Sequence, residues 1–336
     1  MELAVINYAE LISSFCSLGG YFENACIRDS EYGLGIFAVE PGKRVGVYLP
    51  EHLLFLTDNL VVDNDYKLRL LSNAGIPKAV EQFFELYHET IGWDRAIESI
   101  QLTQASWFAI PGSVKDWLLK MGVLIYCFSE PNSQALLSRY CGERRIFYKK
   151  NKINRSFLMP MVEIINHSSE ATRFIFGSGV KVESLVKDEL LVNYGLDLDP
   201  LQQFVEFNFS SSPEFTYSIP ISLKSKSGSI FISSNPPLGY GSVSSVLIKD
   251  ADIHISHLQI YNSNEKGKPL RSFINLMKAY GLAENDSCGV FNLIIEQNKN
   301  AFLGLKNLLN ESDFSLVEKM KLMVTHQLQG LENASR

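Results

Sequence analysis

The chain has 336 residues, of which 46% are hydrophobic and 20% are charged, a balance typical of a globular protein that buries a core. No apolar run reaches the roughly 18 residues that a membrane-spanning helix needs, and the net charge of -6 disfavours general nucleic-acid binding, because an acidic chain repels phosphate backbones. The five cysteines are scattered and form no C-x-x-C pair, so neither a disulfide framework nor a metal site is predicted.

The first part of the chain predicts a helix and then strands. Residues 7–17 place Leu11 and Phe15 on one helical face, and two glycines at 19–20 end the element. Residues 35–39 and 44–49 have strand character on either side of a turn at 40–42. Residues 77–125 show helical spacing of apolar side chains, so we predict a helical insert over about 61–125.

The second part of the chain returns to strands before it ends in helices. Residues 156–165 form an apolar run, predicted as a strand, and residues 173–194 regain strand character. Strands and Gly/Ser/Pro loops alternate over 213–260, and helical spacing returns over 268–330. We therefore predict an α+β fold: a domain over 1–212 with several short sheets and the insert, and a largely helical domain over 213–336.

Three short motifs stand at the ends of predicted strands. They are Gly33-Leu34-Gly35, Asn166-His167 and Tyr194-Gly195. Each is weak alone, because a glycine pair, a histidine after a strand and a Tyr-Gly pair are usually turns or packing. In this order, with 28 residues between Asn166 and Tyr194, they resemble the SET-domain methyltransferases.

The resemblance is closer to the Rubisco large-subunit methyltransferase-like class. This class begins with a short helix that ends in Gly-Gly, seen here as AELISSFCSLGG, and continues with a Pro-x-x-Leu-Leu-x-Leu-Thr run, seen at 50–57. It also has a long helical insert, lacks cysteine-rich flanks and carries a helical C-terminal domain that binds the substrate protein. The resemblance covers about residues 8–212 in motif order.

The resemblance implies a cofactor, an acceptor and residue roles. The cofactor would be S-adenosylmethionine, and the partner a protein that presents a lysine. Tyr194 would be the catalytic residue, because its hydroxyl can position a methyl group and an amine. The implied cofactor-binding residues are Gly33, Leu34, Gly35, Arg145, Glu163, Asn166, His167 and Phe209, and the implied lysine channel is Phe147, Val192 and Phe207.

Three positions depart from the pattern of this class. Glu163 stands where aspartate is usual, Arg144 stands where serine is usual, and Phe207-Asn208-Phe209 replaces a Tyr-Gly-Phe element. The third change removes a hydroxyl and bears on the number of methyl groups added, or on the nitrogen that is accepted. Arg144 and Arg145 also belong to a basic stretch over 137–155, where most charges are expected to be solvated and one or two to hold an anionic group.

Three alternatives stay open from the sequence. The acceptor can be histidine rather than lysine. The chain can be a catalytically silent SET-like interaction protein, although it retains Gly33, Gly35, Asn166, His167 and Tyr194. The motif match can also be chance in an unrelated α/β enzyme. Because the start of the chain has no basic leader, we expect a cytoplasmic location, with nuclear, organellar and exported locations left open.

Overall fold

The computed structural model describes residues 8–30, 33–123, 125–150, 153–168, 170–194, 197–225, 228–233, 246–250 and 252–335. The chain divides into two compact units, unit 1 with residues 1–103 and 131–195, and unit 2 with residues 104–130 and 196–336. Among the described helices, none is both long and apolar enough to cross a membrane.

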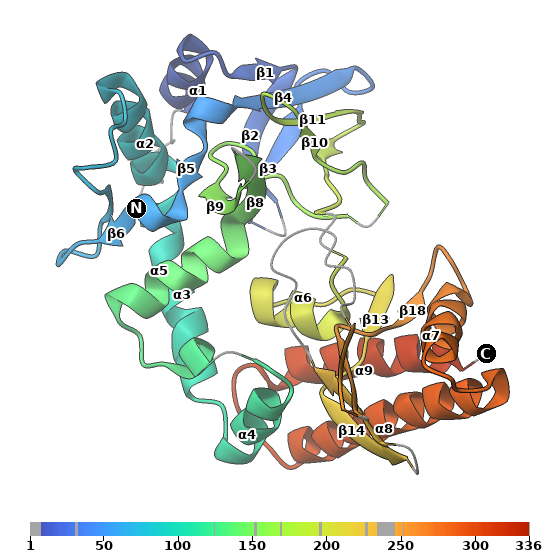
Figure 1. Ribbon diagram of the computed structural model, residues 1–336. Coiled ribbons are helices and arrows are strands. Elements are labelled where there is room, and N and C mark those ends of the chain that lie inside the picture. The colour runs from blue at the N-terminus through green and yellow to red at the C-terminus, as the bar shows by residue number, and fades with distance from the viewer. Residues whose placement is uncertain are drawn as a thin grey trace. The chain divides into compact units, whose positions relative to one another are not determined.

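Unit 1 is built from short sheets and a few helices (Figure 1). Its helices are α1 (Tyr8–Ser17), α2 (Lys78–Thr90), the first part of α3 (Trp93–Phe108) and α5 (Ser133–Arg144), with 3-10 turns η1 (Glu51–Leu53) and η2 (Thr57–Asn59). Its strands are β1 (Tyr21–Glu23), β2 (Ala25–Ser30), β3 (Gly33–Ala38), β4 (Arg44–Pro50), β5 (Phe55–Leu56), β6 (Leu60–Val62), β7 (Leu68–Leu70), β8 (Arg145–Lys150), β9 (Ile153–Leu158), β10 (Ile175–Phe176), β11 (Gly179–Leu185) and β12 (Glu189–Leu190).

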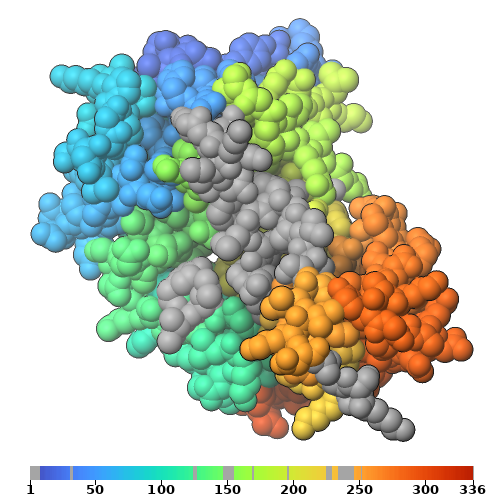
Figure 2. Space-filling view, viewed as in Figure 1, coloured from blue at the N-terminus to red at the C-terminus, as the bar shows by residue number. Residues whose placement is uncertain are grey.

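The sheets of unit 1 join strands that are distant in sequence. Their strand orders are β1-β4-β11-β10, β12-β3-β2, β5-β9-β8 and β6-β7, and every named pair is antiparallel. Figure 2 shows the consequence at the surface, where the yellow-green atoms of the β10–β11 region lie beside the blue atoms of the N-terminal strands. The predicted α+β architecture with several small sheets is therefore confirmed.

Packing explains how the first helix ends. Leu11 and Phe15 lie four residues apart on α1 and are fully buried, and the Phe15 ring stacks on Phe83 of α2 at 5.8 Å between centroids. Gly19 has a φ of +85°, and a Cβ at Gly20 would lie 2.6 Å from the Phe15 ring. Glycine is needed at both positions, first for the backbone conformation and then for space.

Two features of unit 1 could not be read from the strand and helix predictions. The strands predicted on either side of the turn at 40–42 are present as β3 and β4, and they belong to different sheets. The insert over 61–125 is not wholly helical, because β6 and β7 pair as a hairpin between Leu60 and Leu70. The insert is also divided, since α2 and residues up to Thr103 belong to unit 1 and residues 104–130 belong to unit 2.

Unit 2 combines long helices with two sheets, a two-stranded antiparallel sheet and a four-stranded mixed sheet. Its helices are the end of α3, α4 (Gly112–Lys120), the 3-10 helix η3 (Ile125–Phe128), α6 (Pro200–Phe207), α7 (Lys268–Ala279), α8 (Glu284–Asn310) and α9 (Val317–Ala334). Its strands are β13 (Phe215–Tyr217), β14 (Ile221–Ser225), β15 (Gly228–Ser233), β16 (Val246–Lys249), β17 (Asp252–Ser256) and β18 (Gln259–Asn262), in the orders β13-β18 and β14-β15-β17-β16. The strands predicted for 213–260 and the helices predicted for 268–330 are both confirmed.

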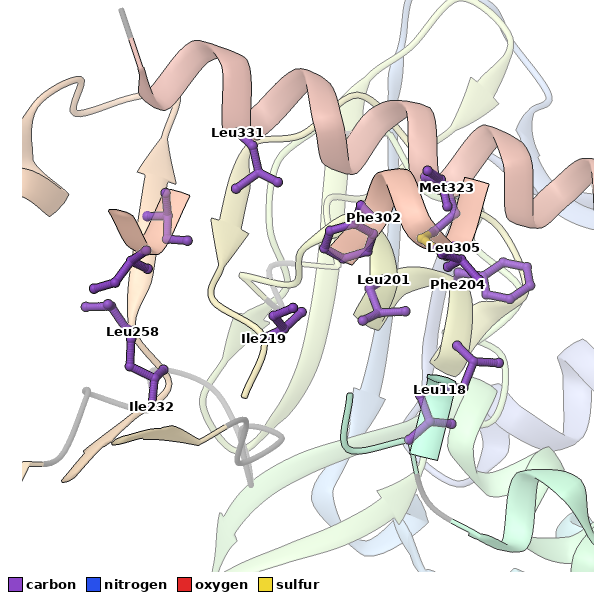
Figure 3. Close-up of a cluster of buried hydrophobic side chains, with 14 of the residues drawn as sticks. Leu118, Leu201, Phe204, Ile219, Ile232, Leu258, Phe302, Leu305, Met323 and Leu331 are labelled. Atoms are coloured by element: carbon purple, nitrogen blue, oxygen red, sulfur yellow. The ribbon is translucent and has the colours of Figure 1, made fainter. Parts of the chain in front are cut away.

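The core of unit 2 lies where α8 and α9 run side by side and cover the strands (Figure 1). Figure 3 shows Leu201 and Phe204 of α6 gathered with Phe302 and Leu305 of α8 and Met323 of α9. Burial of these large apolar side chains is the main source of stability in such a core, at roughly 25 cal/mol for each Å² removed from water. Leu201 and Phe204, which the sequence prediction placed in the first domain (1–212), thus lie in the core of unit 2.

Candidate functional site

The side chain of Asn166 brings the Asn-His motif and the glycine motif together inside unit 1. Its amide nitrogen donates to the backbone oxygen of Leu34 at 3.3 Å, to the Ser30 hydroxyl at 3.2 Å and to a Glu189 carboxylate oxygen at 2.6 Å. The glycine motif at the start of β3 and the Asn-His motif are 132 residues apart in the chain and adjacent in space. Asn166 is therefore the residue that joins the two motifs.

The Asn-His segment runs parallel to the segment that ends in Tyr194. His167 and Val192 form a parallel bridge, with the Val192 N–H donating to the Asn166 oxygen at 3.0 Å and the Ser168 N–H donating to the Val192 oxygen at 3.1 Å. A second parallel bridge joins Arg173 and Asn193. These two bridges place the segments side by side.

The two glycines of the first motif serve different purposes. Gly33 has a φ of +111°, which strains any other residue, and a Cβ there would meet no atom within 4 Å. A Cβ at Gly35 would overlap Glu189 Oε1 and would lie 3.1 Å from Asn166 Nδ2. The resemblance implied that both glycines bind the cofactor, and at Gly35 the space of a Cβ is taken by Glu189 and Asn166 of the chain itself.

Tyr194 is held on three sides. Its hydroxyl donates to the Ile165 oxygen at 3.2 Å, its backbone N–H donates to His167 Nδ1 at 3.3 Å, and its ring is stacked on Phe174 with centroids 6.2 Å apart. The His167 ring lies 4.9 Å from the Tyr194 ring. Burial raises the pKa of the phenol to about 12, so the hydroxyl keeps its proton at neutral pH. Tyr194 can position a group, but it cannot serve as a base at neutral pH.

The apolar run before Asn166 is a strand only in its first part, contrary to the prediction. β9 ends at Leu158, and the chain then turns, with the N–H groups of Val162 and Glu163 both donating to the Met159 oxygen at 3.1 and 2.9 Å. Met161 takes a φ of +69° in this turn. The turn residues are apolar because the turn itself is buried, so composition alone did not distinguish it from a strand.

The turn directs Glu163 into a buried polar cluster that the sequence analysis missed. The Glu163 side chain is 2% exposed and accepts a hydrogen bond from the Tyr140 hydroxyl at 3.2 Å. Tyr140 Oη also lies 3.2 Å from His88 Nδ1, and Arg144 Nε lies 3.9 Å from Glu163 Oε1. We call Tyr87, His88, Tyr140, Arg144 and Glu163 the buried polar cluster. A cofactor contact by Glu163 stays a prediction.

Of the two adjacent arginines, Arg144 is the one that joins this cluster. It ends α5, forms an ion pair with Glu143 at 2.9 Å, and places its guanidinium 4.5 Å from the centre of the Tyr140 ring. Arg145 begins β8 opposite Leu158, and its cofactor role stays a prediction. No helix was predicted over residues 133–144, although the i, i+4 spacing of Tyr140 and Arg144 was a usable signal, because residues at this spacing lie on one face of a helix.

The remaining predicted residues are distributed over both units. Val192 is fully buried beside the Asn-His segment. Phe147 lies in β8 opposite Ser156, and its side chain is outside the described part of the structure, as is Gly195. Phe207 and Phe209 belong to unit 2, where their rings stack at 5.9 Å, and Phe209 is 37% exposed. Their roles stay predictions.

The electrostatic character of the site is set by burial. His167 has a lowered pKa because it is partly buried, which favours the neutral ring. Burial raises the pKa of Glu163, while Arg144 and the tyrosine hydroxyls oppose that shift. Within the described ranges, no group of three or more His, Cys, Asp or Glu side chains is placed to hold a metal ion.

Comparison with known proteins gives structural similarity only. No protein-family model matches the chain, and no curated protein matches it. Among solved structures, it is similar to the SET domain of LSMT bound to lysine and AdoHcy (TM-score 0.45, 13% identity, 96% of this chain and 88% of that chain). It is similar to Rubisco LSMT bound to sinefungin and monomethyllysine (0.45, 14%, 96% and 89%) and to the LSMT SET domain bound to methyllysine and AdoHcy (0.41, 13%, 97% and 89%).

Proposed function

We propose that this protein is a SET-type methyltransferase that transfers a methyl group from S-adenosylmethionine to a lysine side chain of another protein. One observation carries the proposal. Asn166 contacts Leu34 of the glycine motif, and its neighbour His167 contacts Tyr194, so three motifs from distant parts of the chain form one site. Chance matches to three short motifs have no reason to converge in this way.

The residues around Asn166 fit the proposed cofactor. The backbone at Gly33 is exposed and open, since a Cβ there would meet no atom within 4 Å. The Glu189 carboxylate and the Leu34 backbone oxygen are hydrogen-bond acceptors next to Asn166. Acceptors suit S-adenosylmethionine because this ligand carries a positively charged sulfonium and a positively charged ammonium group. Gly33, Leu34, Asn166 and His167 would hold S-adenosylmethionine, and when bound it would supply an electrophilic methyl group.

The role of Tyr194 follows from its hydrogen bonding. The hydroxyl donates its one hydrogen to the Ile165 oxygen, so any further contact of the phenol oxygen is made as an acceptor. An oxygen in this state can accept weak C–H···O contacts from a methyl group and an N–H from an amine. Such contacts align an in-line displacement, and alignment accounts for most of the rate that an enzyme can add to methyl transfer.

Lysine is the proposed acceptor, and it would have to arrive without its proton. A buried apolar environment favours the neutral amine, and Val192 is fully buried beside the site. The high pKa of Tyr194 means that solvent, and not this phenol, would take the proton. We further propose that residues 213–336 bind the substrate protein, because they contain none of the three motifs.

The proposal is tested by binding first and by transfer second. S-adenosylhomocysteine should raise the melting temperature of the full chain, because a ligand at 100 times its dissociation constant adds about 2.7 kcal/mol to stability. The protein should then label lysines of a lysate with a radioactive methyl donor. Binding of S-adenosylhomocysteine without methyl transfer would support the catalytically silent interaction protein. Label on histidine would show that histidine, and not lysine, is the acceptor. Absence of S-adenosylhomocysteine binding would refute the proposal.

A further inference from the structure

Glu163 is the centre of a set of buried contacts that the proposed reaction does not use directly. Its carboxylate is 2% exposed, accepts from the Tyr140 hydroxyl at 3.2 Å and lies 3.9 Å from Arg144 Nε. A carboxylate this deeply buried is costly unless charged or polar groups compensate it. Tyr140 and Arg144, both from α5, provide that compensation.

The single hydrogen of the Tyr140 hydroxyl is committed to Glu163. The backbone N–H of Trp93 donates to His88 Nδ1 at 3.2 Å, so this nitrogen carries no proton and its one lone pair already has a donor. Burial lowers the pKa of His88 to about 3, which keeps the ring neutral. Although Tyr140 Oη also lies 3.2 Å from His88 Nδ1, Glu163 is the acceptor with lone pairs to spare.

The orientation of Tyr140 is fixed by its neighbours. Its ring lies edge-on to Trp93 at 5.1 Å, and the Arg144 guanidinium lies 4.5 Å above its centre. Arg144 is in turn held by Glu143 at 2.9 Å. Burial raises the pKa of Glu163, and the Arg144 guanidinium opposes that shift. The Glu163 side chain is therefore fixed by Tyr140 and Arg144, and each of these residues is fixed in turn by its own neighbours.

The turn that carries Glu163 also carries the acceptor for Tyr194. The Ile165 oxygen, two residues after Glu163, accepts from the Tyr194 hydroxyl at 3.2 Å. The next oxygen, that of Asn166, accepts from the Val192 N–H at 3.0 Å. A shift of this turn would move the Tyr194 hydroxyl, and a displacement of about 1 Å at a reacting centre can cost about 100-fold in rate.

We propose that Tyr140, Arg144 and Glu163 form a positioning network that sets the place of the Tyr194 hydroxyl through the turn at 159–165. This inference rests on the proposed function for its effect on turnover. Arg144 and Glu163 are two of the positions that depart from the class pattern, and they form an ion pair with each other. In this network both residues serve to fix the turn at 159–165. Neither needs to touch the cofactor or the acceptor.

The first test measures single-turnover methyl transfer. Tyr140→Phe keeps the ring and removes the bond to Glu163, and should lower the rate at least about fivefold with S-adenosylhomocysteine affinity within about twofold. Tyr48→Phe is the matched control, because it removes a hydroxyl of unit 1 that bonds to Ser178 instead, and should change the rate less than twofold. Glu163→Gln, which keeps an acceptor for Tyr140, should retain more activity than Glu163→Ala.

The second test does not depend on activity. Tyrosines labelled with carbon-13 at Cζ report the hydrogen bonding of each phenol, and Tyr194→Phe identifies the Tyr194 resonance. Tyr140→Phe should shift that resonance, and Tyr48→Phe should leave it in place. An unmoved resonance in Tyr140→Phe overturns the network, even if turnover falls. If the wild type methylates nothing but the resonance shifts, the proposed function fails and the network stands.

Discussion

Asn166 donates its side-chain amide to the Glu189 carboxylate at 2.6 Å, and so ties the Asn-His motif to the strand that leads to Tyr194. The same amide reaches Ser30 and the Leu34 oxygen. Asn166, which was predicted to bind the cofactor, thus also connects its own segment to the segments of Leu34 and Glu189 by hydrogen bonds. Substitutions at Asn166 should therefore affect stability as well as binding.

Asn166→Asp should destabilise the protein at pH 7 by about 2 kcal/mol, because it replaces a donor to Glu189 by a second carboxylate. Repulsion raises the folded-state pKa of the pair above its unfolded value, so the loss should be smallest at low pH and should grow as pH rises through the folded-state pKa. Denaturant unfolding at pH 5 and pH 7 measures this. The exposed Asn300→Asp is the control, with a change within about 0.5 kcal/mol at both pH values.

Gly35→Ala should cost about 1–3 kcal/mol, because the added methyl group would overlap Glu189 Oε1 and press on Phe37 at 3.0 Å. Gly289→Ala, on the exposed side of α8 with nothing within 4 Å, should instead gain about 0.5–1 kcal/mol. Thermal unfolding of both variants distinguishes a steric clash at Gly35 from the general effect of replacing glycine by alanine. Equal effects at the two positions would contradict the close contact at Gly35.

His88 should make the wild type sensitive to acid. Burial lowers its pKa from 6.5 to about 3, so the stability that it contributes is complete above pH 6.5 and is lost as pH falls toward 3. Between pH 7 and pH 5 the wild type should lose about 2 kcal/mol relative to His88→Gln, which does not titrate. Unfolding curves of the two proteins at both pH values test this, and a constant difference would mean that His88 titrates normally.

Tyr194→Phe should lower single-turnover methyl transfer at least about tenfold, which corresponds to about 1.4 kcal/mol of barrier. Affinity for S-adenosylhomocysteine should change much less, because the hydroxyl acts mainly in the transition state. Calorimetry and single-turnover kinetics on the same preparations separate the two effects. Turnover equal to that of the wild type would remove Tyr194 from the catalytic role and leave only its packing on Phe174 and His167.

Exposed leucines on α8 should affect the substrate protein and not the cofactor. Leu293 and Leu303 are 49% and 46% exposed, and serine at either position should raise the KM for the protein substrate by at least about threefold, since an exposed apolar contact contributes about 1 kcal/mol or more when it is buried. Leu102→Ser, 70% exposed on α3, is the control. Weaker cofactor binding in the α8 variants would contradict the proposed division of labour.

Local patterns were sufficient for most of the elements. The spacing of Leu11 and Phe15 indicated α1, and the helical spacing over 268–330 indicated α7 to α9, because burial of one face imposes a period that can be read along the chain. The order of Gly33, Asn166 and Tyr194 carried the resemblance to the SET-domain methyltransferases, because each motif is short and contiguous.

The tertiary structure alone decided what surrounds those motifs. The apolar residues at 159–165 form a buried turn and not a strand, because burial selects apolar side chains whatever the backbone does. Position 35 requires glycine because Glu189, 154 positions later, occupies the space that a side chain would need. The buried charge of Glu163 is compensated by Tyr140 and Arg144, which belong to α5. Contacts of this kind join residues with no local periodic relation, so they arise only when the chain has folded.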